Sequence, residues 1–225
     1  MQKLNVLILC EESQAVCKAF RNIGHRAFSC DLQKCAKNGV PGWHINADAN
    51  YFLDGGTRFK TQDGRWHTVL RWDLIIAHPP CTYLCKVSNV HMVVKGHVKW
   101  PRLRSMILAR RFFLKCLSAP ANFVAVENPL PMARAQLPKP TTYVQPYDFG
   151  HNYSKKTLLW LKNLPPLFPT SPEGRHKEFV KSSRGKYRSR TFPGIAEAMA
   201  KQWSEHIILA KRNFTHPPAP KAVSC

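Results

Sequence analysis

The chain has 225 residues, of which 44% are hydrophobic; this predicts a globular domain with a substantial core and excludes a disordered chain. There are 34 lysine and arginine residues against 13 aspartate and glutamate residues, so the net charge is +21 at pH 7. Such a cation excess favours a polyanionic partner such as a nucleic acid, because neutralised phosphates release their counterions. A membrane partner is not expected, since no apolar run is long enough to span a bilayer.

The eight cysteines are spread along the chain without the two-residue spacing typical of zinc pairs. The N-terminal apolar stretch is too short for a signal peptide. We therefore expect reduced thiols, no structural metal and a location in the cytoplasm.

The first 31 residues have the pattern of a nucleotide-binding βαβ unit. Residues 4–9 are apolar and predict a strand, Ser13 is a candidate helix cap, and residues 14–23 predict a helix. Residues 25–30 predict a second strand, which Asp31 closes. An acid at this position commonly accepts hydrogen bonds from ribose hydroxyls, and a turn or helix-capping aspartate is an equally good interpretation.

The turn after the first predicted strand contains Glu11 and Glu12 and no glycine. A carboxylate here is suited to contact the amino group of a cofactor, but both acids can equally be solvated residues of the first helical turn. Residues 43–50 then predict a short third strand ending near Asp48, and residues 51–71 predict a polar loop or hairpin.

The segment 72–85 organises the chain. Residues 74–77, Leu-Ile-Ile-Ala, are typical of a strand buried on both faces of a parallel sheet. Pro79 and Pro80 end this strand, because proline has no N–H to give to a ladder. Cys81 follows, where open α/β sheets place their ligands. The alternative is a thiol that only packs behind the turn.

A second buried strand is predicted at residues 123–126, and it ends in Glu127-Asn128. Between the two strands lie a basic loop at 86–101 and a helix expected over 102–117. The loop suits contact with a nucleic-acid backbone, although a surface loop without that role has the same composition. Glu127 has its own alternative as a capping or salt-bridged acid.

An apolar strand ending in Pro-Pro-Cys, a helix, and an apolar strand ending in Glu-Asn, in this order, resemble DNA cytosine-C5 methyltransferases. The resemblance implies an α/β fold: a Rossmann-like, S-adenosylmethionine-dependent methyltransferase with a mostly parallel central sheet flanked by helices. It implies that Cys81 adds to C6 of a cytosine flipped out of double-stranded DNA, and that Glu127 hydrogen-bonds the N3 and N4 edge of the base. Asn128 would shape the turn, and neighbouring groups would lower the pKa of Cys81.

The same resemblance assigns further roles. S-adenosylmethionine is the implied cofactor, although the family's glycine-rich first turn is missing. Its expected contacts are Glu11, Glu12, Asp31, Asp48 and Pro79. Lys155 and Lys156 stand where the family usually has arginines that orient the base or a phosphate. The residues expected to contact nucleic acid are Lys86, Lys95, Arg184, Lys186, Arg188 and Arg190.

The C-terminal part holds a basic insertion at about 165–193, where the family usually has a separate target-recognition domain. A final helix is predicted from 191 to about 210, so one catalytic domain is expected over 1–210, followed by a flexible tail at 211–225. In size the chain resembles compact phage-encoded methylase-like proteins, which implies the cytoplasm of a bacterial or phage-infected cell. A protein partner or a homodimer would then supply target recognition.

Two other functions stay open. Amino methyltransferases that act on adenine N6 or cytosine N4 use Asp/Asn-Pro-Pro-Tyr/Phe, whereas here His78 and Cys81 flank the prolines. A catalytically silent methyltransferase fold that binds DNA or a protein partner is favoured by the turn without glycine and by the missing recognition domain.

Overall fold

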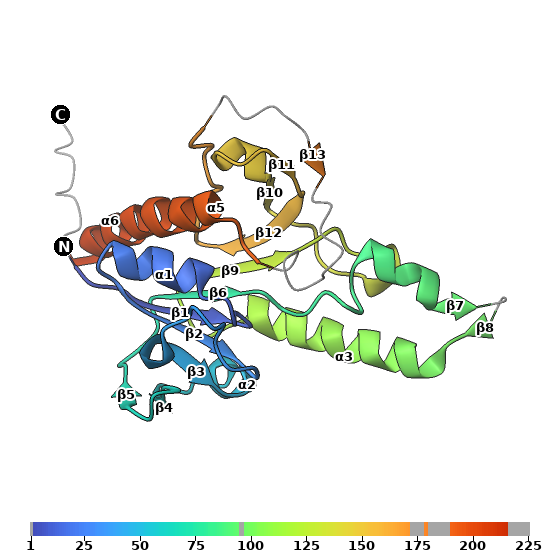
Figure 1. Ribbon diagram of the computed structural model, residues 1–225, viewed down its shortest axis with the longest axis horizontal. Coiled ribbons are helices and arrows are strands. Elements are labelled where there is room, and N and C mark those ends of the chain that lie inside the picture. Colours follow the sequence, from blue (N-terminus) through green and yellow to red (C-terminus); the bar gives the residue numbers. More distant parts are fainter. Residues whose placement is uncertain (1, 95–96, 172–177, 180–189, 216–225) are drawn as a thin grey trace, which may run out of the picture.

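A seven-stranded sheet forms the centre of the computed structural model, which describes residues 2–94, 97–171, 178–179 and 190–215 (Figure 1). Its strands are β1 (Asn5–Leu9), β2 (Arg26–Asp31), β3 (His44–Asn46), β6 (Leu74–Ala77), β9 (Phe123–Asn128), β10 (Thr142–Val144) and β12 (Thr157–Lys162). The spatial order is β10-β12-β9-β6-β1-β2-β3, and every neighbouring pair is parallel except the two that β12 makes. The predicted mostly parallel α/β sheet is therefore confirmed.

The strand order locates the region where a ligand is expected. In chain order, the first five strands of the sheet are arranged 3-2-1-4-5, as in doubly wound nucleotide-binding folds. The order reverses between β1 and β6. Ligands of open α/β sheets bind outside the carboxyl ends of the strands at this switch point, which here is the edge where β1, β6 and β9 end.

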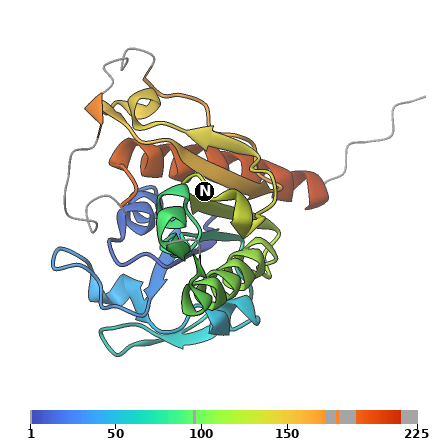
Figure 2. The same ribbon diagram turned by 90° about the vertical axis from the view of Figure 1, so that its right-hand side faces the viewer.

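Helices cover both faces of the sheet, as the two views in Figures 1 and 2 show. One face carries α1 (Ala15–Asn22) and a C-terminal helix made of α5 (Pro193–Ala198), a π-helical turn (Met199–Trp203) and α6 (Ser204–Thr215). The other face carries α2 (Asn50–Leu53) and α3 (Trp100–Leu117). The fold thus has three layers, with the sheet in the middle.

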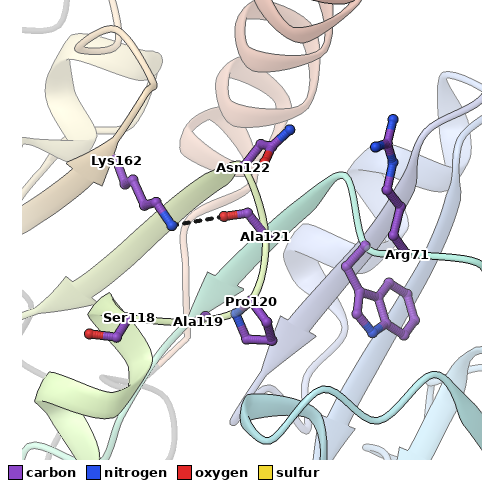
Figure 3. Close-up of a pocket in the computed structure, with 8 residues that line it drawn as sticks. Arg71, Ser118, Ala119, Pro120, Ala121, Asn122 and Lys162 are labelled. Carbon is purple, nitrogen blue, oxygen red and sulfur yellow. Dashed lines mark hydrogen bonds between the residues drawn. The ribbon is translucent and has the colours of Figure 1, made fainter.

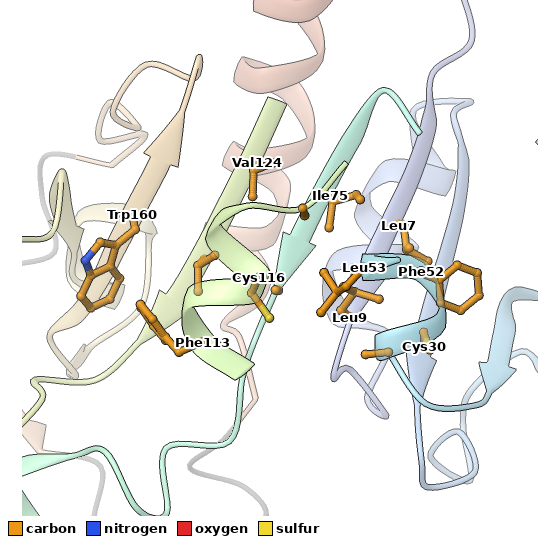
Figure 4. Packing of buried hydrophobic residues seen from close by; sticks show 14 of the residues in the cluster. Leu7, Leu9, Cys30, Phe52, Leu53, Ile75, Phe113, Cys116, Val124 and Trp160 are labelled. Carbon is orange, nitrogen blue, oxygen red and sulfur yellow. The ribbon is translucent and has the colours of Figure 1, made fainter. Parts of the chain in front are cut away.

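The alternation of side chains along the strands builds two cores. Leu7, Ile75 and Val124 point towards α2 and α3, where they meet Phe113 and other apolar side chains (Figure 4). The residues next to them in each strand point to the opposite face and pack on α1 and the C-terminal helix. Because β6 is buried on both faces, its sequence is apolar throughout.

Short 3-10 helices and short strands outside the central sheet complete the fold. They are η1 (Pro41–Trp43), β4 (Arg58–Lys60), β5 (Trp66–Thr68), η2 (Lys86–His91), β7 (Val93–Val94), β8 (His97–Val98), η3 (Ala133–Ala135), η4 (Pro146–Phe149), β11 (Tyr153–Ser154) and β13 (Glu178–Phe179). The β4–β5 hairpin confirms the loop or hairpin predicted over 51–71. Among the described residues, no helix is long and apolar enough to cross a membrane.

Three predicted boundaries were wrong. The third strand covers only His44–Asn46, because residues 41–43 form a 3-10 turn and α2 begins at Asn50, whose backbone N–H donates to Asp48 Oδ1 over 2.8 Å. Ser13 is not the cap of α1; Gln14 occupies the N-cap position in a left-handed conformation. The final helix continues to Thr215, beyond the expected start of the tail at 211, and Lys211 Nζ pairs with the buried Asp73 carboxylate.

Candidate active site

The register of β6 and β9 brings two titratable side chains together at the carboxyl edge of the sheet. Ala77 lies opposite Val126, so the next residues, His78 and Glu127, are neighbours. His78 Nδ1 lies 3.0 Å from Glu127 Oε2, and the two side chains are only 13% and 11% exposed. Thr191 Oγ1 donates a second hydrogen bond to the same Oε2 atom over 3.2 Å. Glu127 was expected here, whereas no functional role was predicted for His78.

The two groups shift each other's pKa. Burial alone would raise the pKa of Glu127, but His78, Lys155 and Thr191 outweigh it and hold the pKa below the usual value. Burial alone would lower the pKa of His78, but Glu127 and, more weakly, Glu11 outweigh it and raise the pKa. His78 and Glu127 therefore favour each other's charged form.

Asn128 ties the two strand ends together. Its Nδ2 atom donates to the carbonyl oxygen of Pro79 over 2.8 Å, and the side chain is 2% exposed. This contact agrees with the expected role of Asn128 in shaping the turn, and it holds Pro79 beside the end of β9. Within the described residues, Asn128 Oδ1 and His78 Nε2 are buried and have no hydrogen-bond partner.

Cys81 begins a tight turn directly after the two prolines. Its carbonyl oxygen accepts hydrogen bonds from the N–H groups of Leu84 and Cys85, over 2.9 and 3.0 Å. The thiol is partly buried, and its pKa is raised, first by burial and then by Cys85, while Lys155 lowers it only weakly. The expectation that neighbours lower this pKa was wrong, because burial and, after it, Cys85 outweigh the effect of Lys155.

The two candidate lysines have different surroundings. Lys155 is half-buried, its Nζ atom donates to the Arg190 carbonyl oxygen over 3.2 Å, and its charge acts on Glu127, His78 and Cys81. Lys156 is exposed, and its Nζ atom lies 4.2 Å from the centre of the Tyr143 ring. The structure therefore brings Lys155 to the site and leaves Lys156 on an aromatic ring outside it.

Glu11 caps α1 in place of the predicted Ser13. Its Oε1 and Oε2 atoms accept hydrogen bonds from the N–H groups of Val16 and Cys17, over 2.6 and 3.2 Å, at the start of α1. The side chain is buried, so its interpretation as a solvated residue was wrong. Burial raises the pKa of Glu11, although nearby His78 opposes the shift.

The remaining acids surround the turn after β1. Cys10 has a φ of 60°, so the backbone reaches the left-handed conformation without the glycine that usually adopts it. Asp31 and Asp48 both lie close enough to Cys10 to raise its pKa, after the larger effects of burial and Cys116. Glu12 lies farther along the turn, with Oε1 3.8 Å from the Arg190 guanidinium.

Asp31 and Asp48 each use one carboxylate oxygen locally. Asp31 Oδ1 accepts from the N–H of Gln33, and Asp48 Oδ1 accepts from Asn50, each over 2.8 Å. Within the described residues, the Oδ2 atom of each accepts no hydrogen bond. The carboxylates have the chemistry to receive ribose hydroxyls and an adenine amino group, so the residues present fit the nucleoside part of S-adenosylmethionine.

The residues expected to contact nucleic acid are only partly described. Lys86 is exposed at the start of η2, directly after the Cys81 turn, and Arg190 is half-buried beside Glu12. Lys95, Arg184, Lys186 and Arg188 lie outside the described residues. The sequence from 74 to 126 contains eight lysines and arginines and no aspartate or glutamate, so the segment from β6 to β9 is strongly cationic.

A surface hollow of about 330 Å³ lies away from these groups (Figure 3). It is lined by the segments before β6 and β9, including Arg71 and Asn122, and by Lys162, whose Nζ atom donates to the Ala121 carbonyl oxygen over 3.0 Å. Because β6 and β9 begin at this edge, the hollow is at the opposite end of the strands from Cys81. It is not part of the candidate active site.

Comparisons with solved structures found several chains with limited similarity, among them two methyltransferases. One, provisionally described as a DNA modification methyltransferase encoded within a prophage (E. coli), has a TM-score of 0.41 and 15% identity, with 71% of this chain and 46% of that chain covered. The other, the Entamoeba histolytica methyltransferase EhMeth, has a TM-score of 0.39 and 14% identity, with 74% and 55% covered. The chain spans about half the length of each. No family model matches the chain, and no curated protein matches its sequence.

Proposed function

We propose that this chain is an S-adenosylmethionine-dependent DNA methyltransferase that acts on C5 of cytosine. The observation that carries the proposal is the meeting of two strand ends: the Cys81 turn after β6 and Glu127 at the end of β9. The Asn128–Pro79 hydrogen bond fixes one to the other. A nucleophile and an acid–base group are thereby held at the edge where ligands of this fold class bind.

The residue types suit the chemistry of an electron-poor ring carbon. In the proposed reaction, Cys81 adds to C6, which makes C5 enamine-like and able to attack a methyl group. S-adenosylmethionine, when bound, supplies that methyl group from its sulfonium. Glu127 exchanges a proton with the N3 and N4 edge as charge moves through the ring. The raised pKa of Cys81 disfavours its thiolate in the free chain, so activation of the nucleophile is part of what the proposed reaction requires.

The acids around the turn after β1 support the proposed cofactor. Asp31 and Asp48, at the ends of β2 and β3, would receive the ribose and the adenine. Glu11 already caps α1, so its carboxylate would contact the cofactor amino group only while keeping the hydrogen bonds to Val16 and Cys17. Glu12, nearer the surface of the same turn, is the second candidate for that amino group.

Double-stranded DNA is the proposed substrate because the surface charge suits a phosphate backbone. Flipping the target base out of the duplex costs a few kcal/mol, which contacts to phosphates would offset. Lys86, beside the Cys81 turn, and Lys155, beside Glu127, are the described cations best placed for this. A protein partner or a second copy of the chain would supply target recognition.

The test is transfer of labelled methyl from S-adenosylmethionine to unmodified DNA. We expect label at cytosine C5 with the wild type, none with Cys81→Ser, and near-normal transfer with Cys35→Ser as the matched control. DNA containing 5-fluorocytosine should trap a covalent complex with Cys81, because the ring then has no C5 proton to lose. Label on an exocyclic nitrogen that survives Cys81→Ser would instead establish an amino methyltransferase.

Two observations favour a second candidate, a catalytically silent protein that binds DNA or another partner. The Cys81 thiol has a raised pKa, and the buried Glu11 carboxylate is bonded to α1. In that case salt-sensitive DNA binding would persist while no methyl group is transferred and no cofactor binds.

A further inference from the structure

His78 is the most enclosed titratable group of the site without an assigned role. It follows β6 directly, and its backbone N–H donates to the Leu9 carbonyl oxygen over 3.0 Å, which fixes the residue between the ends of β1 and β9. Its ring faces Glu127 from β9 at 3.0 Å and the charge of Glu11 from the turn after β1. Lys155, before β12, is the cation that opposes its protonation.

The hydrogen bonds on Glu127 are divided unevenly between its two oxygens. Oε2 receives both His78 Nδ1 and Thr191 Oγ1. Oε1 accepts no hydrogen bond from any described residue, and the side chain is 11% exposed. A carboxylate held in this way presents one oxygen to the protein and the other to whatever enters the site.

Two further polar atoms at this edge of the sheet have no hydrogen-bond partner among the residues that the structure describes. His78 Nε2 and Asn128 Oδ1 are buried and have no hydrogen-bond partner among the described residues, and Asn128 is 2% exposed. Buried polar atoms are rarely left unsatisfied, because each costs about 1–3 kcal/mol. Their presence at the end of β6 and β9 points to a polar ligand that completes the site.

The state of Glu127 raises a problem for the proposed reaction. When sulfur adds to C6 of cytosine, the ring nitrogen N3 must gain a proton. A buried glutamate on its own would have a raised pKa and would carry that proton, but here His78 holds the pKa of Glu127 low, so the carboxyl is ionised. The proton therefore has to come from a neighbouring group, and His78 Nδ1 is hydrogen-bonded to that carboxylate.

We propose that His78 is a positioning residue that stores a proton for Glu127 and supplies it to cytosine N3 through the carboxyl group. This inference rests on the proposed function. As the Cys81 sulfur–C6 bond forms, electrons of the C5–C6 double bond shift through C4 to N3. Glu127 Oε2 takes the proton from His78 Nδ1, which leaves a neutral imidazole. Rotation of the carboxyl group then turns the new O–H towards N3, which takes the proton from it.

The later steps return the proton. The enamine carbon C5 takes the methyl group from the sulfonium, and N3 gives its proton back through Glu127 to His78. Loss of the C5 proton to solvent then expels the Cys81 sulfur and restores the aromatic ring. No net proton is taken from His78 over the cycle, so the residue acts through Glu127 rather than on the reacting carbon.

The test combines imidazole titration with a pH profile. Nuclear magnetic resonance of labelled histidine in the full chain should show a His78 pKa above the ordinary 6.5 that falls when Glu127 is replaced in Glu127→Gln. In methyl transfer, His78→Asn, which keeps a hydrogen-bond donor but cannot store a proton, should lower kcat on the order of 100-fold at neutral pH with little change in KM. The alkaline limb of the pH profile of His78→Asn should move to lower pH. His206→Gln changes a histidine of α6 that lies outside the site, so it is the control and should keep the wild-type profile.

Each contrary result has a separate meaning. A His78→Asn enzyme with the wild-type rate and pH profile would overturn the proton role while leaving the methyltransferase proposal standing. A wild type that transfers no methyl group would overturn the proposed function, and the proton role with it. If His78→Asn does not fold, the titration decides: a His78 pKa that does not respond to Glu127→Gln overturns the inference.

Discussion

Two acids of this chain lie at the same edge of the sheet, at the ends of the two strands that flank β6, and the structure uses them in different ways. Glu127, at the end of β9, keeps Oε1 without a hydrogen bond from the described residues and pairs with His78 through Oε2. Glu11, just after β1, gives both oxygens to the N–H groups of Val16 and Cys17. The Glu127 carboxylate therefore keeps one oxygen available for a ligand, whereas the Glu11 carboxylate uses both oxygens to cap a helix.

The difference follows from what comes next in the chain. After β9 the chain turns away at Asn128-Pro129, so no helix N-terminus competes for the Glu127 carboxylate. After β1 the chain enters α1 within a few residues, and the first N–H groups of a helix need acceptors. A strand-end acid is thus a stronger candidate for catalysis when no helix begins directly behind it.

The largest effect should come from removing the Glu127 carboxylate. Glu127→Gln keeps the shape and the hydrogen bond from Thr191 but cannot carry a proton, so we expect methyl transfer to fall on the order of 1000-fold. DNA binding, measured by fluorescence anisotropy, should change little. Methyl transfer within a few-fold of the wild type would mean that the carboxylate is only structural.

The buried pair should also determine how stability depends on pH. The raised pKa of His78 stabilises the fold below its unfolded value of 6.5, and this contribution is lost as pH rises through the folded pKa. The lowered pKa of Glu127 stabilises the fold above 4.5, and this contribution is lost as pH falls through the folded pKa. The free energy of unfolding of the wild type should therefore exceed that of His78→Asn most between pH 4.5 and 6.5, by about 3 kcal/mol. Urea unfolding at a series of pH values measures this difference.

Two results would contradict that expectation. A stability difference that does not vary between acidic and alkaline pH would show that His78 contributes by packing alone. A difference that grows as pH rises would reverse the sign and place the neutral imidazole in the folded state.

Removing the Glu11 carboxylate should affect stability before it affects chemistry. Glu11→Ala leaves the first N–H groups of α1 without their acceptor, so we expect a loss of about 2 kcal/mol in the free energy of unfolding. Glu12→Ala, which removes the neighbouring carboxylate but no α1 cap, is the matched control and should lose less than half as much. Equal losses would mean that Glu11 is not the functional cap of the helix.

How far the sequence predicted this architecture depends on the range of the forces involved. The buried strands at 4–9, 74–77 and 123–126 were predicted because a strand covered on both faces must be apolar along its whole length. The placement of the Cys81 turn and Glu127 at one edge of the sheet followed from the same pattern, since parallel strands end at one edge. Both features depend only on local sequence and on sheet geometry.

The missed features depend on contacts between distant segments. The His78–Glu127 pair joins residues from two strands, and only their register shows that they meet. The sequence did contain a signal for His78, since it is the polar residue directly after the apolar strand and before two prolines. The cap of α1 was placed at Ser13 because serine is a common N-cap, but a glutamate that reaches back to the helix from the preceding turn satisfies the same N–H groups.

The smallest predicted effect separates the two lysines, which no pattern in the sequence distinguished. Lys155→Met removes a cation that acts on Glu127 and Cys81, so DNA binding should weaken and the slope of log affinity against log salt should fall by about 1. Lys156→Met removes a cation that rests on the Tyr143 ring and should leave the slope unchanged, which makes it the matched control. Equal slopes for the two variants would show that neither lysine contacts a phosphate, and that Lys155 acts only through the charge it places beside the His78–Glu127 pair.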